Sequence, residues 1–540
     1  MCKAKDKDKL AVAFLKKEIV TTKISEPLRM FPFRNRTSTL SQSTIARSLL
    51  QGIFLVPPRL LMMTTAIATG AIVSKVCTLG VSEKDLLTKP LTGWRATLRK
   101  STFRRASRLF LMSLGFNKIH TEGHIASRDT APIIVCNHQA PWEAIALSTL
   151  TEMSFISSDA NFKMPILGNV FFAAQHIRVD RTDENSRSSV EKEIRRRARN
   201  SAWNHVAIFP EGTCGNGTCL MTFRLGAFTP SLAIQPVVVR YTFDQRHGID
   251  PAWAGYEVGL VRLAARLMCQ LSNHITLTFL EVIQPTEAQQ VQPLLFSDAV
   301  RARMAKALNV PLTPHSVDDT MLQVEAIRLK FRPEDVVLGM DQIRTSHRFS
   351  VDDVKEALQQ FKSMDVDKNR ILNYGEFLRA MCMPDSLIMK EVWSVFTQGQ
   401  DLNGLACPML RVKDYIYSAI RVAKEMSSAR LILASFRMID LDGDDFISFD
   451  EWLKAMQTGS PDVERQQALR VFRRVDVENN GVIDVFDFGR ALREKPTWMC
   501  FFLVLLSKQD TDDGRLAASK LNSVLHMCQW RPPNSNQSDA

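Results

Sequence analysis

Between about residues 120 and 300, apolar residues fall into short runs separated by stretches with helical spacing. The runs are rich in β-branched residues and have the length of buried strands. They cover residues 133–136, 206–209, 235–241 and 275–282, and the helical stretches include 143–150 and 188–204. Because strands and helices alternate along the chain, the pattern predicts an α/β domain over residues 120–300.

A long apolar stretch lies early in the chain. Only 15 uncharged residues separate Arg59 from Lys75, fewer than the roughly 20 that a straight membrane span needs. A longer span would include Arg59 and the pair Pro57-Pro58. We expect a membrane anchor at 48–76, either one kinked span or a re-entrant hairpin, with a buried soluble helix as the alternative. Basic residues flank both sides, so their distribution does not fix the topology.

The next segment, residues 90–118, mixes aromatic and aliphatic residues with arginines. Such a composition is typical of a helix that lies in the headgroup layer of a membrane. A solvated basic helix or a nucleic-acid-binding patch has the same composition. Because an apolar anchor precedes it, we interpret this segment as membrane-interfacial.

A twelve-residue pattern recurs near the C-terminus, at 365–376, 440–451 and 476–487. Each copy has oxygen-bearing side chains at positions 1, 3, 5, 9 and 12, Leu or Ile at position 8, and an aromatic residue after position 12. These copies resemble EF-hand loops, in which Ca²⁺ takes about six to eight oxygen ligands. The repeat therefore predicts an all-α EF-hand domain over residues 346–525.

The predicted Ca²⁺ ligands occupy positions 1, 3, 5, 7 and 12 of each loop, with position 7 contributing its backbone carbonyl. They are Asp365, Asp367, Asn369, Ile371 and Glu376 in the first loop; Asp440, Asp442, Asp444, Phe446 and Glu451 in the second; and Asp476, Glu478, Asn480, Val482 and Asp487 in the third.

The three loops differ in quality. The second has the most acidic ligands, whereas the first carries Arg370 where glycine normally makes the sharp turn. The third ends in Asp487, whose shorter side chain predicts weaker Ca²⁺ binding or a share of Mg²⁺. The second and third loops form a natural pair. The first needs a partner near residue 401, where a stretch poor in acids and with Pro408 predicts a hand that binds no ion and serves only for packing. The alternative is that all the hands are scaffolding.

Composition adds little to these patterns. The formal net charge is +12, concentrated towards the N-terminus, and the ten cysteines include no C-x-x-C pair. The cysteines suggest reduced thiols rather than a zinc ribbon or a disulfide scaffold. We interpret residues 1–47 as a flexible basic N-terminus without a cleavable signal peptide, 301–345 as a helical linker and 526–540 as a polar tail.

The candidate chemistry begins at His138, which follows the run at 133–136. Glu143 stands five residues later, too far round a helix for both side chains to share one face. They can meet if His138 ends a loop and Glu143 lies in the first turn of a helix after Pro141. A histidine oriented by a carboxylate is suited to act as a general base at neutral pH. Alone, however, a histidine after a strand is more often structural.

Three further blocks follow in order: 164–181 with a G-x-x-F…R pattern, the F-P-E-G-T of 209–213, and the proline-containing strand 234–241. Together with His138 they resemble the four-block signature of the glycerolipid acyltransferases. The stretch EGTCGNGTCLMTFRLGAF resembles the lysophosphatidylcholine acyltransferase and lyso-platelet-activating-factor acetyltransferase branch, which also has a membrane segment and EF-hands.

This resemblance implies an α/β acyltransferase domain that transfers an acyl or acetyl group from CoA to a lysophospholipid in phospholipid remodelling. Lysophosphatidylcholine or lyso-platelet-activating factor would be the acceptor. It implies Ca²⁺ responsiveness, membrane lipids rather than nucleic acid as partners, and the endoplasmic reticulum, Golgi or lipid droplets as location. The oligomeric state stays open. The implied catalytic residues are His138 and Glu143, and the implied acceptor-binding residues are Arg181, Glu211, Gly212, Thr213 and Arg224.

Two departures from the family pattern weaken the enzyme interpretation. The family has Asp where this chain has Glu143, and a misplacement of about 1 Å can cost roughly a hundredfold in rate. Gly217 stands where related sequences often carry Arg, which removes a possible anion contact. The rival hypothesis is therefore a catalytically weak relative that works as a Ca²⁺-binding membrane adaptor.

Overall fold

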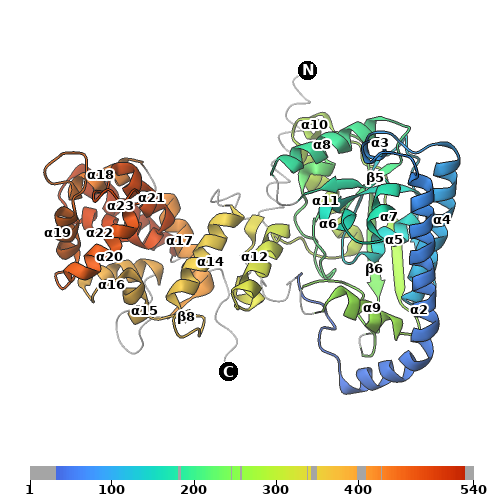
Figure 1. Ribbon diagram of the computed structural model, residues 1–540, viewed down its shortest axis with the longest axis horizontal. Coiled ribbons are helices and arrows are strands. Elements are labelled where there is room, and N and C mark those ends of the chain that lie inside the picture. Colours follow the sequence, from blue (N-terminus) through green and yellow to red (C-terminus); the bar gives the residue numbers. More distant parts are fainter. Residues whose placement is uncertain are drawn as a thin grey trace, which may run out of the picture. The chain divides into compact units, whose positions relative to one another are not determined.

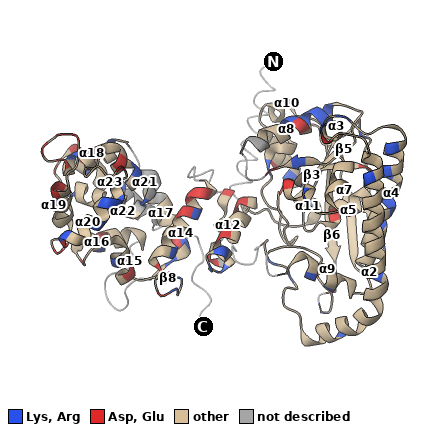
Figure 2. Cartoon of the chain, in the orientation of Figure 1, with Lys and Arg blue, Asp and Glu red and all other residues tan. Residues whose placement is uncertain are grey.

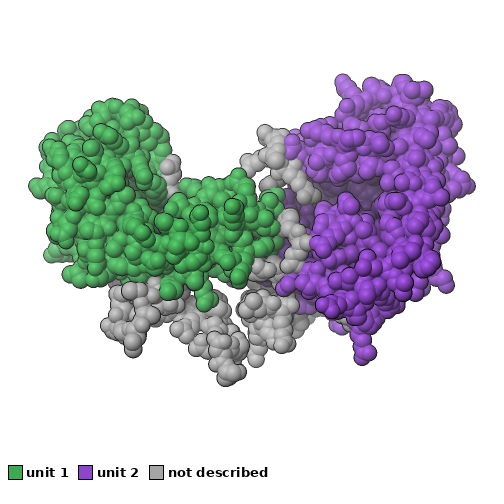
Figure 3. All heavy atoms as spheres, turned by 60° about the horizontal axis from the view of Figure 1, so that its bottom comes forward, with its two compact units in different colours: residues 1–25, 321–540 green, residues 26–320 purple. Residues whose placement is uncertain are grey.

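The computed structural model describes residues 32–180, 184–244, 246–255, 258–336, 338–341, 350–397, 409–426 and 429–528. The chain forms two compact units, residues 26–320 and residues 321–540 (Figure 3). Figure 2 shows basic residues along α4 of the first unit and acidic residues on α14 of the second. The charge is thus regional, as the sequence indicates.

The first unit is built on a seven-stranded sheet in the order β1-β7-β6-β2-β5-β3-β4. All neighbouring strands are parallel except β6 and β7, which pair antiparallel. Its strands are β1 (Ile119–Glu122), β2 (Ile133–Cys136), β3 (Met153–Ser158), β4 (Ile177–Val179), β5 (His205–Ile208), β6 (Ile234–Thr242) and β7 (His274–Phe279). The predicted α/β domain is confirmed.

Helices cover both faces of this sheet (Figure 1). Successive residues of a strand point to opposite faces, so Ile134 and Cys136 of β2 join one apolar core while Ile133 and Val135 join the other. The first core is closed by α4 (Gly93–Ser113), α5 (Trp142–Ser148) and α9 (Leu260–Met268); the second by α8 (Glu184–Arg199) and α11 (Pro293–Leu308). The shorter elements are α3 (Glu83–Thr88), α6 (Asp159–Phe162), α7 (Gly168–Ala173), η1 (Leu225–Ala227) and α10 (Glu287–Val291).

The expected membrane anchor is a single helix, α2 (Gln42–Thr78), which contains Pro57 and Pro58. It lies alongside α4 and also contacts α7 and α9 (Figure 1). Arg59 is buried in its middle and donates from Nη1 to the carbonyl of Met268 at 2.8 Å. The structure therefore has one helix packed on the domain and not the re-entrant hairpin that we considered.

The second unit is mostly helical, as the repeat predicts. Its helices before the second predicted loop are α14 (Val351–Met364), α15 (Tyr374–Met381), α16 (Leu387–Phe396), α17 (Val412–Met426) and α18 (Ala429–Ile439); α12 (Val317–Arg328) and η2 (Pro333–Val336) lead into it. Those after it are α19 (Phe449–Gly459), α20 (Arg465–Val475), α21 (Val485–Glu494), α22 (Pro496–Ser507) and α23 (Asp512–Cys528).

The loops of this unit are joined in pairs by short β contacts. An antiparallel bridge links Ile447 to Ile483, so the loops at 440 and 476 form a pair. Strand β8 (Ile371–Leu372) pairs antiparallel with β9 (Leu410–Arg411), which joins the loop at 365 to a segment after residue 401. The packing-only hand that we predict there lies largely at 398–408, outside the described residues.

The boundary between the units differs from the sequence prediction. We expect a linker to begin at residue 301, but α11 continues across that position and packs on β6. The first unit ends near residue 320 instead. Phe296, Val300 and Met304 of α11 are fully buried, so this helix belongs to the sheet domain.

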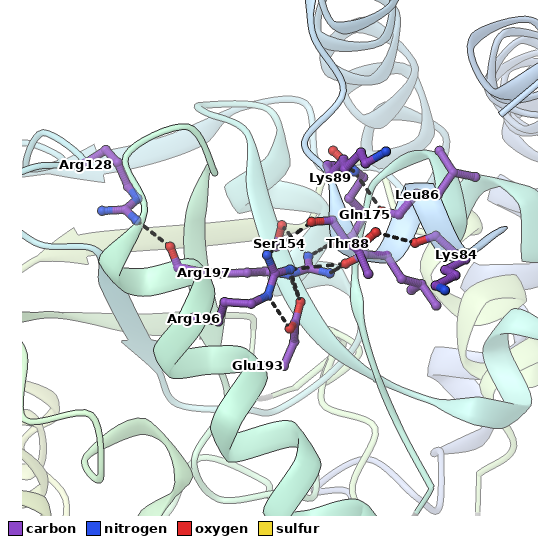
Figure 4. Close-up of polar contacts among 11 residues, drawn as sticks. Lys84, Leu86, Thr88, Lys89, Arg128, Ser154, Gln175, Glu193, Arg196 and Arg197 are labelled. Carbon is purple, nitrogen blue, oxygen red and sulfur yellow. Dashed lines mark hydrogen bonds and ion pairs between the residues drawn. The ribbon is translucent and has the colours of Figure 1, made fainter. Parts of the chain in front are cut away.

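The connection between α2 and α4 is fastened to the sheet domain by buried polar side chains (Figure 4). Arg197 of α8 pairs through Nε with Glu193 at 2.5 Å and donates from Nη2 to the carbonyl of Leu87 at 3.2 Å. Gln175 donates to the carbonyls of Leu86 and Lys89 at 2.8 and 2.7 Å. Because these contacts hold residues 83–89, they also fix how α2 and α4 lie against the sheet.

We expect Arg197→Ala to lower the free energy of unfolding of the sheet domain by about 1–3 kcal/mol, because the carbonyls of Leu87 and Gln175 lose the buried donor that satisfies them. Thermal unfolding followed by tryptophan fluorescence measures this. Arg199→Ala, on the exposed side of the same helix, is the matched control, and an equal effect of both substitutions would contradict the structural role of Arg197.

Candidate functional site

The predicted site residues gather where three neighbouring strands end. Strands β6, β2 and β5 are adjacent and parallel, so the loops that follow them meet at one edge of the sheet. This edge is where parallel sheets usually bind ligands. His138 follows β2, Glu211 follows β5, and Tyr241 lies near the end of β6.

His138 and Glu143 meet across the first turn of a helix. Helix α5 begins directly after Pro141, and Glu143 lies in its first turn. The Nδ1 atom of His138 is 3.2 Å from an Oε atom of Glu143. Phe209 stacks on the imidazole with 4.2 Å between ring centroids. The structure thus has the loop-and-helix arrangement that these two side chains need in order to meet.

Glu143 reaches His138 although it is one CH₂ longer than the family's Asp. Its carboxylate is fully buried and accepts hydrogen bonds from the backbone N–H groups of Gln139 and Ala140 at 3.1 and 2.8 Å. The Tyr241 hydroxyl donates a further hydrogen bond at 2.9 Å. A buried carboxylate needs such partners, so α5, the loop before it and β6 together hold it in place.

Tyr241 is a site residue that the sequence reasoning missed. It ends the apolar run at 235–241, where alternation predicts only core residues. The available signal is the hydroxyl, because a tyrosine at the end of a strand that neighbours the His138 strand can reach the same edge of the sheet.

Cys214 is a second missed residue. It precedes Gly215, whose N–H donates to the His138 carbonyl at 2.8 Å. Burial lowers the pKa of His138, but Cys214 and Glu143 raise it by more, so that the pKa lies well above its usual range.

Glu211 holds two loops together. The resemblance implies that it helps to bind the acceptor. In the structure its carboxylate oxygens accept the backbone N–H groups of His138 at 2.8 Å and Met221 at 3.1 Å. Burial raises the pKa of Glu211 to about 7, although these two donors lower it. Glu211 therefore acts on His138 through the backbone.

The loop residues after Glu211 form a turn in which the backbone lies close to the Arg224 side chain. Gly212 has a φ of +70°, and a Cβ there would lie 3.4 Å from the Arg224 side chain. Arg224 is 43% exposed and forms an ion pair with Asp318 at 3.3 Å. The Thr213 hydroxyl lies 3.4 Å from that of Thr320. Arg224 thus lies beside the loop at 211–213; the remaining predicted anion ligand, Arg181, lies outside the described residues.

The structure explains why glycine is favoured at position 217. Its φ is +74°, and a Cβ at this position would lie 2.4 Å from the Gln139 side-chain oxygen. Gln139 itself donates to the Val239 carbonyl at 3.0 Å. This left-handed conformation favours glycine, and an arginine here would strain the backbone and displace the Gln139 side chain beside His138.

The EF-hand loops fit a divalent cation. Carboxylate oxygens of Asp365, Asp367 and Glu376 lie within 4.8 Å of one another, and those of Asp440, Asp442 and Asp444 do the same. One buried oxygen of Asp365 has no hydrogen-bond partner. Burial and the neighbouring carboxylates raise the pKa of Asp365. Such a cluster of mutually repelling oxygens fits Ca²⁺.

Position 6 of each loop takes the backbone conformation that glycine favours. Arg370 has a φ of 69° and Asp445 a φ of 65°, whereas Gly481 has 86°. Arg370 therefore does not prevent the first loop from turning, although a side chain makes this conformation more costly. In the second loop, Glu451 reaches back from position 12 to accept the N–H of Leu441 at 2.7 Å.

Comparisons with known proteins agree with this architecture. Residues 118–240 match the family model described as Acyltransferase, and residues 429–493 match that described as an EF-hand domain pair. Lysophosphatidylcholine acyltransferase 2 of Danio rerio is 30% identical over 488 residues, which cover 89% of this chain and 89% of that protein. The chain belongs to this acyltransferase family.

Other relatives span a similar share of the chain. Lysophosphatidylcholine acyltransferase 2 of Mus musculus is 28% identical, and the matched residues cover 82% of this chain and 80% of that protein. Lysophospholipid acyltransferase LPEAT2 of Arabidopsis thaliana is 28% identical, with 88% and 86% covered. The family confirms the predicted combination of an acyltransferase domain with EF-hands and supports acyl transfer and Ca²⁺ binding. It gives no support to the Mg²⁺ that we considered for the third loop.

The pKa of Glu211 rises from its ordinary value of 4.5 to about 7 in the folded protein. At a pH between these two values, folding therefore takes up a proton at Glu211. The free energy of unfolding that depends on this group therefore falls as the pH rises through that window, by about 3 kcal/mol. The side chain introduced by Glu211→Gln does not titrate. We therefore expect the difference in Tm, wild type minus variant, to decrease from pH 5 to 7 and to stay constant at higher pH. The exposed Glu281→Gln is the control; parallel pH curves for wild type and Glu211→Gln would contradict the prediction.

Proposed function

We propose that this protein is an acyl-CoA or acetyl-CoA:lysophospholipid O-acyltransferase that acts on lysophosphatidylcholine or lyso-platelet-activating factor. The supporting observation is the contact of 3.2 Å between His138 and the buried Glu143. Membership of the acyltransferase family supports the same reaction class. The acceptor and the chain length of the donor are part of the proposal.

In this mechanism His138 is the general base in its neutral form, and because its pKa is raised, the fraction of this form grows as the pH rises. Glu143 binds the Nδ1 side of the ring, which keeps the proton there and leaves Nε2 to accept the proton of a nucleophile. The negative charge of Glu143 also stabilises the imidazolium that forms. The acyl donor is an activated thioester, so the protein mainly has to deprotonate the lysolipid hydroxyl and hold it close to the acyl carbon.

The acceptor's phosphate would lie near the loop at 211–213. Gly212 lets backbone N–H groups approach an anion, and Arg224 lies beside it. Arg181 would complete the anion site, since guanidinium groups bind phosphate in a bidentate manner. Glu211 supports this arrangement by fixing the backbone of His138.

The membrane attachment is proposed to be monotopic. Among the described residues, α2 is the one helix long and apolar enough to cross a membrane. Arg59, however, ties its middle to the carbonyls of Met268, at the end of α9, and Leu271. A helix held in this way favours lying in one leaflet. Its exposed apolar residues would enter the lipid: Leu49, Leu50, Ile53, Phe54, Leu60, Leu61, Ile72 and Val76. The endoplasmic reticulum is the proposed compartment.

The rival function, a catalytically weak Ca²⁺-binding adaptor, depends on the two departures from the family pattern. The contacts of Glu143 and the packing at Gly217 provide a structural reason for both residues. Acyl transfer is therefore the function that the site supports better.

The wild type should transfer radiolabelled acyl or acetyl groups from CoA to at least one member of a lysolipid panel. His138→Ala should abolish this transfer, whereas the exposed His120→Ala on β1 should leave it unchanged. Glu143→Asp should reduce kcat/KM by about a hundredfold, because a shortened side chain misplaces the imidazole by about 1 Å. An inactive wild type that Glu143→Asp revives would establish the adaptor function instead.

The loop at 440 should bind Ca²⁺ through its three clustered aspartates. We expect Asp442→Ala to weaken Ca²⁺ binding by at least about tenfold, because affinity follows the number of charged ligands. Asp445→Asn in the same loop is the matched control, since Asp445 is not a ligand and asparagine tolerates its φ of 65°. Isothermal titration calorimetry of the full chain measures both, and equal affinities would show that this loop does not bind the ion.

A further inference from the structure

The loop that carries His138 is fastened to strand β6 by side chains. Strand β2 pairs with β6 as far as Cys136. Beyond that point, the Asn137 side chain donates to the Val239 carbonyl at 3.0 Å and accepts the N–H of the same residue at 2.7 Å. Gln139 donates to this carbonyl at 3.0 Å. The two amide side chains therefore continue the pairing of β2 with β6 into the loop.

Tyr241 makes the next contact along β6. It lies two residues beyond Val239, so both side chains point to the same face of the sheet and join the same apolar core. The ring of Tyr241 is buried there with Phe116, at 6.0 Å between ring centroids. Its hydroxyl donates to Oε1 of Glu143 at 2.9 Å. The core thus sets the position of this hydroxyl.

The two oxygens of the Glu143 carboxylate have different partners. Oε2 lies 3.2 Å from Nδ1 of His138, whereas Oε1 accepts the Tyr241 hydroxyl. The N–H of Ala140 lies between them, at 2.8 Å from Oε1 and 3.0 Å from Oε2. The last torsion of a glutamate side chain has only broad preferences of its own. A donor at each end therefore selects the rotation in which Oε2 faces the imidazole.

The length of the side chain at position 143 decides whether both ends are reached. Helix α5 carries Glu143, and the carboxylate has to extend from this helix to His138 and to Tyr241 at once. An aspartate is one CH₂ shorter, so its carboxylate would lie closer to α5 and would lose one of the two contacts. The Tyr241 hydroxyl is therefore matched to a glutamate.

We propose that Tyr241 is a positioning residue for the base. Its hydroxyl turns the Glu143 carboxylate towards His138, takes up part of the carboxylate's negative charge, and makes glutamate rather than aspartate the working residue at position 143. Burial and the charge of Glu143 raise the pKa of Tyr241 well above its usual range, so the hydroxyl remains a donor at every pH of an assay. Because Tyr241 is buried, it acts through Glu143 and not on the substrate.

Other titratable groups also face this pair. Cys136 ends β2, while Glu211 and Cys214 lie in the loop after β5. Glu211 accepts backbone N–H groups. These groups stay the same when position 241 is substituted. Tyr241 donates to Glu143 itself, so removing its hydroxyl changes the charge that the carboxylate presents to the imidazole.

Tyr241→Phe in the full chain in detergent tests this role, which rests on the proposed function. The substitution removes the hydroxyl and keeps the ring. We expect kcat to fall by about tenfold, less than the roughly hundredfold loss for a displacement of about 1 Å. The KM for the lysophospholipid should stay within about twofold, because the substrate contacts are intact.

The pH profile of kcat/KM should also change. Without the hydroxyl, the carboxylate keeps its full charge and stabilises the imidazolium more, so we expect the acidic limb to move to higher pH by about half a unit. Tyr415→Phe is the matched control, because it removes the hydroxyl of a buried tyrosine that donates to Gln360 at 3.1 Å in the second unit. It should leave kcat and the pH profile unchanged.

A double-substitution cycle tests the match with glutamate. In Glu143→Asp the carboxylate no longer reaches both partners, so adding Tyr241→Phe should cost less than about twofold in kcat instead of about tenfold. A further tenfold loss in that background would show that the hydroxyl acts independently of Glu143, and it would overturn the proposed pairing.

The ionisation of His138 provides a measurement that needs no turnover. Its side chain is 20% exposed, and diethyl pyrocarbonate modifies only the neutral imidazole. The pH midpoint of this modification, followed by mass spectrometry, should rise in Tyr241→Phe and stay unchanged in Tyr415→Phe. It should fall when codon suppression replaces Tyr241 with 3-fluorotyrosine, which keeps the ring and is a stronger donor. A purely structural role of the hydroxyl gives no such opposite shifts.

The outcomes separate the role of Tyr241 from the proposed function. A wild type that transfers acyl groups, with Tyr241→Phe equal to it in kcat and pH profile, overturns the role and leaves the function intact. The same holds if Tyr241→Phe loses activity but neither substitution moves the His138 midpoint. If Tyr241→Phe does not fold, the midpoint of the 3-fluorotyrosine protein decides. A wild type inactive with every donor and acceptor overturns the proposed function, and the midpoints still decide on Tyr241.

Discussion

The buried carboxylate of Glu143 is the interaction on which the site depends. Burying a charged group costs free energy unless hydrogen bonds satisfy it. Here His138, two backbone N–H groups and Tyr241 provide the hydrogen bonds. These partners come from the loop after β2 and from strand β6, while helix α5 carries Glu143 itself. Any shift among the three elements would leave the carboxylate short of a partner, so one charge holds the site in a single geometry.

Sheet topology explains why residues distant in the sequence share this site. His138, Glu211 and Tyr241 are up to about a hundred residues apart, yet β2 lies between β5 and β6 in the sheet. Glu211 adds a further link by accepting the N–H of His138.

The EF-hand unit shows the opposite case, in which local sequence was sufficient. All five ligand positions of each loop lie within twelve consecutive residues, so their spacing alone predicts the cluster that Asp440, Asp442 and Asp444 form. Even here, Arg370 at position 6 looks unfavourable in the sequence, and only the backbone shows that it adopts the required conformation.

The sequence by itself determined the α/β class, the EF-hand repeat, the pairing of the loops at 440 and 476, and His138 with Glu143 as a candidate pair. These features depend on periodicity and on short spacings. Only the tertiary structure decided that Glu143 reaches His138, that Tyr241 and Cys214 belong to the site, that Glu211 binds backbone, and that α11 belongs to the first unit. Each of these depends on contacts across the sheet edge or the core, where the distance in space bears no relation to the distance along the chain.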